Sequence, residues 1–313
     1  MSFLIDFGLK KLAGNSVTVL AFHKVPKLPD DMAPYEHDLA AFIRVLDFVR
    51  AHYPVLPLSD AIKQVQQGSI RNGAVSITFD DGYADWLDGV VPALLERQLP
   101  ATFFLTTGQF EGAPLWHERI RHIVRQASAP IVLSLPGAPE VTLSVATLLD
   151  RQQSTLNLEQ SLKYMPLLER HDCLAALEAQ TGCRLEQVPH MSAADVRTIH
   201  NKGFSIGAHT VDHPILSAVD SATGLHEIGA CKEFLQGLIG APVTEFAYPN
   251  GRKQDFTAEH VQMVEQCGYK VALTTENGIF KKGVSHWQVP RFTPWGETSQ
   301  AMSWQMLRNT FLG

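Results

Sequence analysis

The feature that most constrains the fold is a repeated alternation of short apolar runs with longer stretches of helical periodicity. The runs predicted as strands are residues 17–22, 74–79, 101–105, 204–208, 245–247 and 270–273. The stretches predicted as helices are residues 39–51, 86–98, 193–202, 224–240 and 258–267. Such an alternation is typical of βα units wound around a parallel sheet. The sequence therefore predicts an α/β fold.

The alternation is interrupted between about residues 112 and 189. A Pro- and Gly-rich segment there, SLPGAPEVTLS, predicts a small hairpin, and a helical stretch follows over about residues 156–180. A chain of 313 residues is long enough for one large α/β domain with a full core. We therefore expect a single catalytic domain over residues 1–313 that contains a mainly helical insertion, which could form a cap over the site.

Composition and charge exclude several classes of protein. A net charge of −6 and no block of Lys and Arg argue against a nucleic-acid partner. The four cysteines form no CxxC pair, so neither a zinc knuckle nor a redox motif is indicated. No signal peptide and no apolar run of transmembrane length are found, which favours a cytoplasmic protein. Residues 3–12 are mildly amphipathic and predict either a packed helix or a peripheral membrane contact. The oligomeric state is left open.

Polar residues stand where several predicted strands end. TVLAFH ends in His23, SITFDD in Asp80 and Asp81, and FSIGAHT carries His209, while Asn250 closes EFAYPN. In parallel βα folds the carboxyl ends of the strands share one edge, where active sites are built. We therefore expect these side chains to converge, although loops begin at strand ends in many structures and are polar for that reason.

His209 and His213 are four residues apart, so on a helical turn they share a face and form a pair of metal ligands. A carboxylate added to two imidazoles suits zinc or another borderline divalent ion. One of the adjacent aspartates could then bind the ion while the other acts as a base on the attacking water. Alone, each motif has an ordinary explanation, a solvated Asp-Asp-Gly turn or a pair of capping or core histidines.

Three motifs together resemble a known family. TFDDG (residues 78–82), HTVDHP (209–214) and FAYPNG (246–251) look like the first three motifs of the polysaccharide deacetylases, the NodB-like carbohydrate esterases of family 4. The similarity extends from about residue 17 to residue 292, apart from much of the insertion. It implies an irregular (β/α)7 barrel and an enzyme that removes acetyl groups from N-acetylated sugars with a divalent metal.

The resemblance also implies roles for individual residues. Asp81, His209 and His213 would hold the metal, zinc in the first instance, with cobalt, nickel and manganese as alternatives. Asp80 would be the general base, and the backbone N–H of Asn250 would help to hold the oxyanion.

The sequence departs from the common pattern at two points. Ala247 stands where the third motif usually begins with arginine, and the last strand, ALTTENG, lacks the usual late histidine. The subgroup that resembles exopolysaccharide (poly-N-acetylglucosamine) deacetylases carries an early Phe-His or Tyr-His instead. We therefore expect His23 to be the general acid, unless it only packs near the site. Arg291 is expected to hold Asp80 ionised, or to form a structural salt bridge.

The substrate implied is an N-acetylated sugar in a bacterial-type polysaccharide or glycan precursor. Trp116, Tyr248 and Pro249 are expected to contact it, with Trp116 of PLWHERI stacking on a sugar ring or anchoring the insertion. Two alternatives remain open. One is an amide or ester hydrolase of the same fold that acts on a non-sugar substrate, and the other is a non-catalytic glycan-binding relative.

Overall fold

The computed structural model describes residues 14–111, 114–135, 137–184, 190–294 and 298–312. The predicted amphipathic segment 3–12 and both predicted limits of the insertion, residues 112 and 189, lie outside the described residues.

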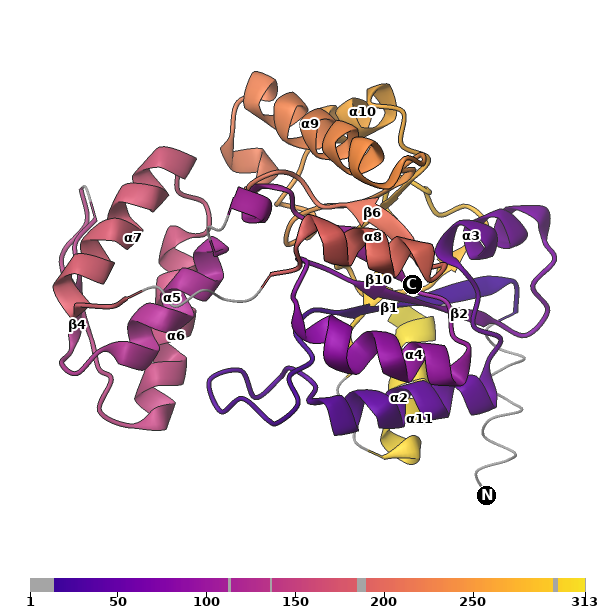
Figure 1. Ribbon diagram of the computed structural model, residues 1–313, viewed down its shortest axis with the longest axis horizontal. Helices are drawn as coiled ribbons and strands as arrows, with labels where there is room; N and C mark the ends of the chain where they lie inside the picture. The colour runs from indigo at the N-terminus through magenta and orange to yellow at the C-terminus, as the bar shows by residue number, and fades with distance from the viewer. Residues whose placement is uncertain (1–13, 112–113, 136, 185–189, 295–297, 313) are drawn as a thin grey trace.

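A curled parallel sheet forms the centre of the molecule (Figure 1). Its strands are β1 (Ser16–Phe22), β2 (Ala74–Phe79), β3 (Thr102–Leu105), β6 (Ser205–Ala208), β7 (Glu245–Ala247), β8 (Val271–Leu273) and β10 (Arg291–Phe292), with β9 (Phe280–Lys281) antiparallel to β1. The strand order is β10-β1-β2-β3-β6-β7-β8. A parallel bridge from Leu273 to Val289 joins β8 to the chain that leads into β10, so the sheet closes on itself irregularly. The predicted barrel fold is confirmed.

Helices cover the outside of this sheet. They are α2 (Leu39–His52), α3 (Leu58–Gln67), α4 (Val91–Arg97), α8 (Ala193–Asn201), α9 (Ser221–Ile239), α10 (Ala258–Gln266) and α11 (Ser299–Leu312), with short 3₁₀ turns η2 (Gly108–Glu111) and η3 (Leu216–Ala218). The predicted helices are found within a few residues of their expected limits.

The stretch 86–98 differs from the regular helix that was predicted. It begins as a π-helical turn, η1 (Trp86–Val90), in which the N–H of Val91 donates to the carbonyl of Trp86. Pro92 follows at the start of α4 and has no N–H to bond the previous turn, so the helix becomes regular only beyond it.

The core lies between the sheet and its helices. Every residue of β1, β2 and β3 is buried, as continuous apolar strands of a covered parallel sheet require. The ring of Phe79 stacks between Phe22, at a centroid distance of 5.5 Å, and Phe103, at 4.9 Å. This aromatic row packs the ends of β1 and β2 together, immediately before Asp80 in the chain.

The insertion forms a group of elements at one side of the barrel (Figure 1, left). It consists of α5 (Trp116–Gln126), a hairpin of β4 (Ile131–Leu133) and β5 (Val141–Leu143), α6 (Leu148–Leu162) and α7 (Leu167–Thr181). These elements pack around a hydrophobic cluster that also includes Met32, from the loop between β1 and α2. The hairpin agrees with the prediction. The single helix predicted over residues 156–180 is wrong, because Pro166 stands at the N-cap of α7 and ends the preceding helix. That the insertion caps the site stays a prediction.

Candidate metal centre and active site

The carboxyl edge of the sheet carries unusual backbone conformations. In the described chain, five non-glycine residues have positive φ, and four of them lie at this edge: Asp81 at 87°, Thr210 at 67°, His213 at 52° and Asn250 at 56°. Such conformations are costly and persist where the surroundings enforce them, which is common at functional sites. The backbone strain is therefore concentrated at the predicted site.

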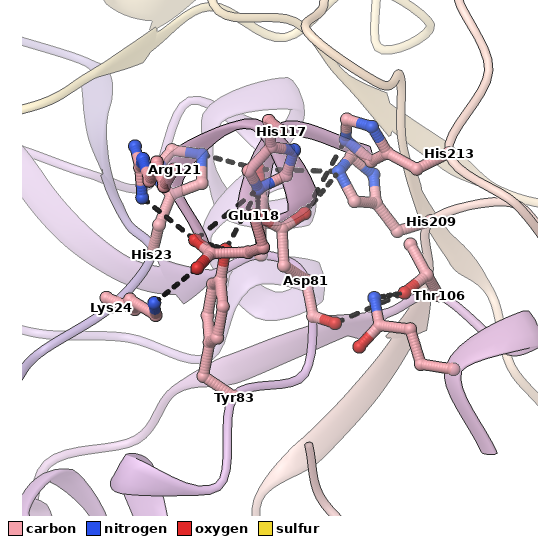
Figure 2. Close-up of polar contacts among 12 residues, drawn as sticks. His23, Lys24, Asp81, Tyr83, Thr106, His117, Glu118, Arg121, His209 and His213 are labelled. Atoms are coloured by element: carbon pink, nitrogen blue, oxygen red, sulfur yellow. Dashed lines mark hydrogen bonds and ion pairs between the residues drawn. The ribbon is translucent and has the colours of Figure 1, made fainter. Parts of the chain in front are cut away.

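The structure brings Asp81, His209 and His213 together (Figure 2). The Nε2 atoms of both histidines lie 3.5 Å from Asp81 Oδ1. His209 Nδ1 lies 2.7 Å from the carbonyl oxygen of Ala247, so Nδ1 is the donor and Nε2 presents its lone pair to Asp81. Three potential ligand atoms from two strand ends therefore face one point.

The environment of these atoms fits a cation. Asp81 Oδ1 is buried and has no hydrogen-bond partner among the described residues. Burial, aided by the neighbouring Asp80, raises the pKa of Asp81 to about 7, although His209 opposes this rise. Burial, followed by the His209 ring, holds the pKa of His213 well below its ordinary value, so this ligand is neutral at pH 7. One carboxylate and two imidazoles are a donor set that could hold a borderline divalent ion.

Asp80 has the opposite electrostatics. Burial alone would raise its pKa, but Arg291 Nη1 donates to Asp80 Oδ1 at 2.7 Å and holds the pKa well below its usual range. The guanidinium is itself buried, and its Nε donates to the carbonyl of Thr274 at 2.8 Å. Asp80 is therefore ionised and fixed in orientation by Arg291, and whether this contact serves the reaction or only the structure stays a prediction.

His23 lies opposite the same carboxylate, with its Nε2 3.9 Å from Asp80 Oδ2. Its side chain is 42% exposed, so an incoming molecule can reach the ring. Trp86 Nε1 donates to the carbonyl of His23 at 2.8 Å, and the N–H of Val25 donates to Asp85 Oδ2 at 2.8 Å. Loss of hydration lowers the pKa of His23, and Asp80 opposes this shift. The histidine is thus held beside the base, while its role as an acid stays a prediction.

The third motif forms a tight turn after β7. Gly251 donates to the carbonyl of Pro249 at 2.6 Å, and the hydroxyl of Thr275 donates to the carbonyl of Asn250. Gly251 has a φ of 66°, and a Cβ there would lie 2.9 Å from the backbone nitrogen of Thr275, so only glycine fits. No acceptor in the described part of the chain takes the N–H of Asn250, which leaves this donor open to a ligand.

One of the predicted substrate contacts is wrong. Tyr248 is fully buried, and its ring stacks on Phe256 at a centroid distance of 4.0 Å, so it packs in the core. Pro249 is buried, as the candidate metal ligands are, and its contact with substrate stays a prediction. Trp116 is 8% exposed, and the guanidinium of Arg170 lies over its ring at 4.7 Å. Sugar contact by Trp116 stays a prediction, with one ring face already covered.

Sequence reasoning missed a polar chain that reaches the site from α5 (Figure 2). His117 Nε2 lies 3.8 Å from Asp81 Oδ2 and 3.0 Å from the hydroxyl of Tyr83. Tyr83 donates to Glu118 Oε1 at 3.2 Å, and a carboxylate can only accept, so His117 must donate to Tyr83. Glu118 also accepts from Lys24 Nζ at 2.6 Å, beside His23. The segment PLWHERI contains His117 and Glu118, but the residues that they contact, Tyr83 and Lys24, are distant in sequence.

The fold and the site together define an α/β barrel with a candidate metal centre at its carboxyl edge. The chain is a member of the polysaccharide deacetylase family: the sequence profile of that family matches residues 67–128 and 159–272, more than half of the chain. The unmatched segment between them contains β4, β5 and most of α6.

Solved structures show the same fold. The Streptococcus pyogenes deacetylase PplD, in complex with acetate, superimposes with a TM-score of 0.63 at 15% identity, over 93% of this chain and 98% of that one. IcaB from Ammonifex degensii gives 0.61 at 17% identity, over 94% and 98%. Bacillus subtilis YxkH, named for the same family, is 25% identical over 113 residues. That match spans 36% of this chain and 39% of YxkH, well under half of either.

Among the described helices, none combines the length and the apolar character that a bilayer span requires.

Proposed function

We propose that this protein hydrolyses the N-acetyl group of an N-acetylated sugar in a polysaccharide or glycan precursor, and that it needs a divalent metal ion. Membership of the deacetylase family supports the reaction class. A solved structure of the same fold is described as a de-N-acetylase from Aggregatibacter actinomycetemcomitans. The observation that carries the proposal is the buried group of Asp81, His209 and His213 directly beside the ionised Asp80.

The ligand set would be Asp81 Oδ1, His209 Nε2 and His213 Nε2. Zinc, bound by these atoms, would polarise the acetyl carbonyl and make water more acidic. The Ala247 carbonyl would keep His209 in the tautomer that binds metal.

The protein's own groups account for the proton transfers. Asp80 accepts a proton from the attacking water as the new C–O bond forms at the acetyl carbon. The N–H of Asn250 donates to the oxygen that becomes negative, a contribution of about 3 kcal/mol in comparable sites. His23 gives a proton to the sugar nitrogen as the C–N bond breaks. The products are acetate and a free amino sugar.

The test is acetate release from N-acetylglucosamine oligomers. We expect a chelator to abolish release, and added zinc to restore it for the native protein but not for His209→Ala. Asp80→Asn should lower kcat by about 10²- to 10⁴-fold, the usual contribution of a general base. Asp47→Asn, which changes an exposed carboxylate paired with Arg97, serves as the control.

Acetate release that persists through chelation and both substitutions would refute the mechanism. Parallel assays with acetyl esters, simple amides and cyclic imides define the substrate class. Faster turnover of a non-sugar substrate would show that the sugar assignment is wrong while leaving the hydrolase assignment intact.

A further inference from the structure

A groove of about 790 Å³ lies between the insertion and the barrel. Its volume is in the range of small-molecule sites. On the barrel side it is lined by Val211 and Asp212, which stand between the two histidine ligands in sequence. On the insertion side it is lined by Trp116 and by the start of α7. The groove is therefore adjacent to the candidate metal centre without being part of it.

Arg170 is the unusual residue of this groove. It is 4% exposed, and its guanidinium lies 4.7 Å from the centre of the Trp116 ring. No hydrogen bond or ion pair within 4 Å satisfies its side chain among the described residues, although a guanidinium carries five N–H donors. Burial lowers the pKa of Arg170 to about 10, so the group remains charged at neutral pH. An unpaired buried charge is costly.

The start of α7 adds further donors to the same groove. Pro166 is its N-cap residue and supplies no side-chain acceptor, so the first N–H groups of the helix are not capped. Pro166, Leu167 and Leu168 all line the groove. The N-terminus of a 15-residue helix favours an anion through these N–H groups and the helix dipole.

Three carboxylates line the groove, those of Glu169, Asp212 and Asp220. Glu169 lies in the first turn of α7, and Asp220 caps α9, where its Oδ1 accepts from the N–H groups of Ala222 and Thr223, each at 3.0 Å. Asp212 and the nearby Glu227 attract Arg170, but neither forms an ion pair with it within 4 Å. Arg170 and the first turn of α7 therefore line the same groove, and no described residue accepts a hydrogen bond from the guanidinium there.

We propose that this groove binds an oxyanion carried by the glycan, a uronate carboxylate or a phosphate, on the Arg170 guanidinium and the first turn of α7. The inference rests on the proposed function and makes it more specific: the substrate is an acidic N-acetylated glycan, with its negative group next to the sugar that loses acetate.

The kinetic experiment compares three substrates: a neutral N-acetylglucosamine tetramer, a tetrasaccharide of alternating N-acetylglucosamine and glucuronate, and N-acetylglucosamine 1-phosphate. For Arg170→Gln we expect kcat/KM on the acidic substrate to fall about 10- to 100-fold, the range for a hydrogen-bonded charge pair. The loss should appear mainly in KM, and kcat/KM on the neutral tetramer should stay within about threefold. Whether the glucuronate or the phosphate substrate is affected identifies the oxyanion.

Two further variants control this comparison. Arg125→Gln also removes one guanidinium, from an exposed ion pair of α5 with Asp30 that lies outside the groove. It should change kcat/KM on the neutral and acidic substrates equally. Arg170→Lys keeps the charge, should retain part of the preference, and replaces Arg170→Gln if that variant does not fold. An equal loss on the neutral and acidic substrates, or no loss on either acidic substrate, would overturn the proposal.

Binding without turnover separates this inference from the proposed function. Sodium glucuronate or inorganic phosphate should raise the Tm of the native protein and of His209→Ala, but not that of Arg170→Gln. If no substrate releases acetate while this pattern holds, the deacetylase assignment fails and the anion site stands. If neither probe raises the Tm of the native protein, the anion site is wrong.

Discussion

Two neighbouring aspartates, identical in chemistry, are given opposite protonation behaviour by their surroundings. Arg291 holds the pKa of Asp80 well below its ordinary value, whereas burial raises that of Asp81 to about 7. The motif predicts that one binds metal and the other accepts a proton. The contact that sets them apart comes from Arg291, and only the family resemblance pointed to it. Packing decides such details, so the burial of Tyr248 could not be predicted from its motif.

A prediction at this scale concerns His23. If it protonates the leaving amine, His23→Ala should lower acetate release from N-acetylglucosamine oligomers by about 10²- to 10⁴-fold. Hydrolysis of 4-nitrophenyl acetate should change little, because nitrophenolate leaves without a proton donor. The control is His226→Ala, at an exposed position on α9. Equal losses on the amide and the activated ester would rule out the acid role.

The elements of the barrel could be predicted because each carries its own signal, an apolar run that ends in polar residues or an amphipathic period. The elements of the insertion could be predicted less well. Its helix α5 was not predicted, although PLWHERI opens it, because its buried face pairs with charges from elsewhere in the chain. Lys24 is 94 residues from Glu118, and such pairings leave no periodic pattern in the sequence.

The attachment of α5 to the barrel leads to a stability prediction. Glu118 is 1% exposed and accepts from Lys24 Nζ at 2.6 Å and from Arg121 Nη1 at 2.8 Å. Glu118→Gln leaves two cations undercompensated and should cost about 3 kcal/mol of the free energy of unfolding. Glu178→Gln removes the α7 partner of Arg119, which like Glu118 lies on α5. This ion pair is more exposed, so its loss should cost about 1 kcal/mol of the free energy of unfolding. Urea unfolding measures both, and equal costs would contradict the assigned role.

At the scale of the whole molecule, the site exists because parallel strands end at one edge. Residues 80 and 209 are far apart in sequence but adjacent at that edge, which the alternation of strands and helices already predicts. Arg291 lies in β10 at the level of Val19 of β1 and reaches Asp80 with its side chain. No such group lies at the opposite ends of the strands among the residues that the structure describes, and a carboxylate buried there affects stability rather than chemistry. Glu245, at the start of β7, is 5% exposed and lies near α3.

Glu245 therefore makes the stability of the fold depend on pH. Burial, opposed by a hydrogen bond from the backbone of Ser59, raises its pKa to about 7 from the unfolded value of 4.5. The folded state favours the protonated acid, so its stabilisation is complete below pH 4.5 and is lost as the pH rises through about 7. The difference between these two pKa values corresponds to about 3 kcal/mol.

Glu245→Gln should flatten this fall in stability between pH 5 and 8 in urea unfolding, making the variant relatively more stable at pH 8. The pKa of Glu227 is also raised to about 7, so the free energy of unfolding of Glu245→Gln should still fall somewhat with rising pH. The exposed Glu233→Gln should leave the profile unchanged, and a Glu245→Gln profile as steep as the native one would show that this carboxyl is ionised in the folded protein.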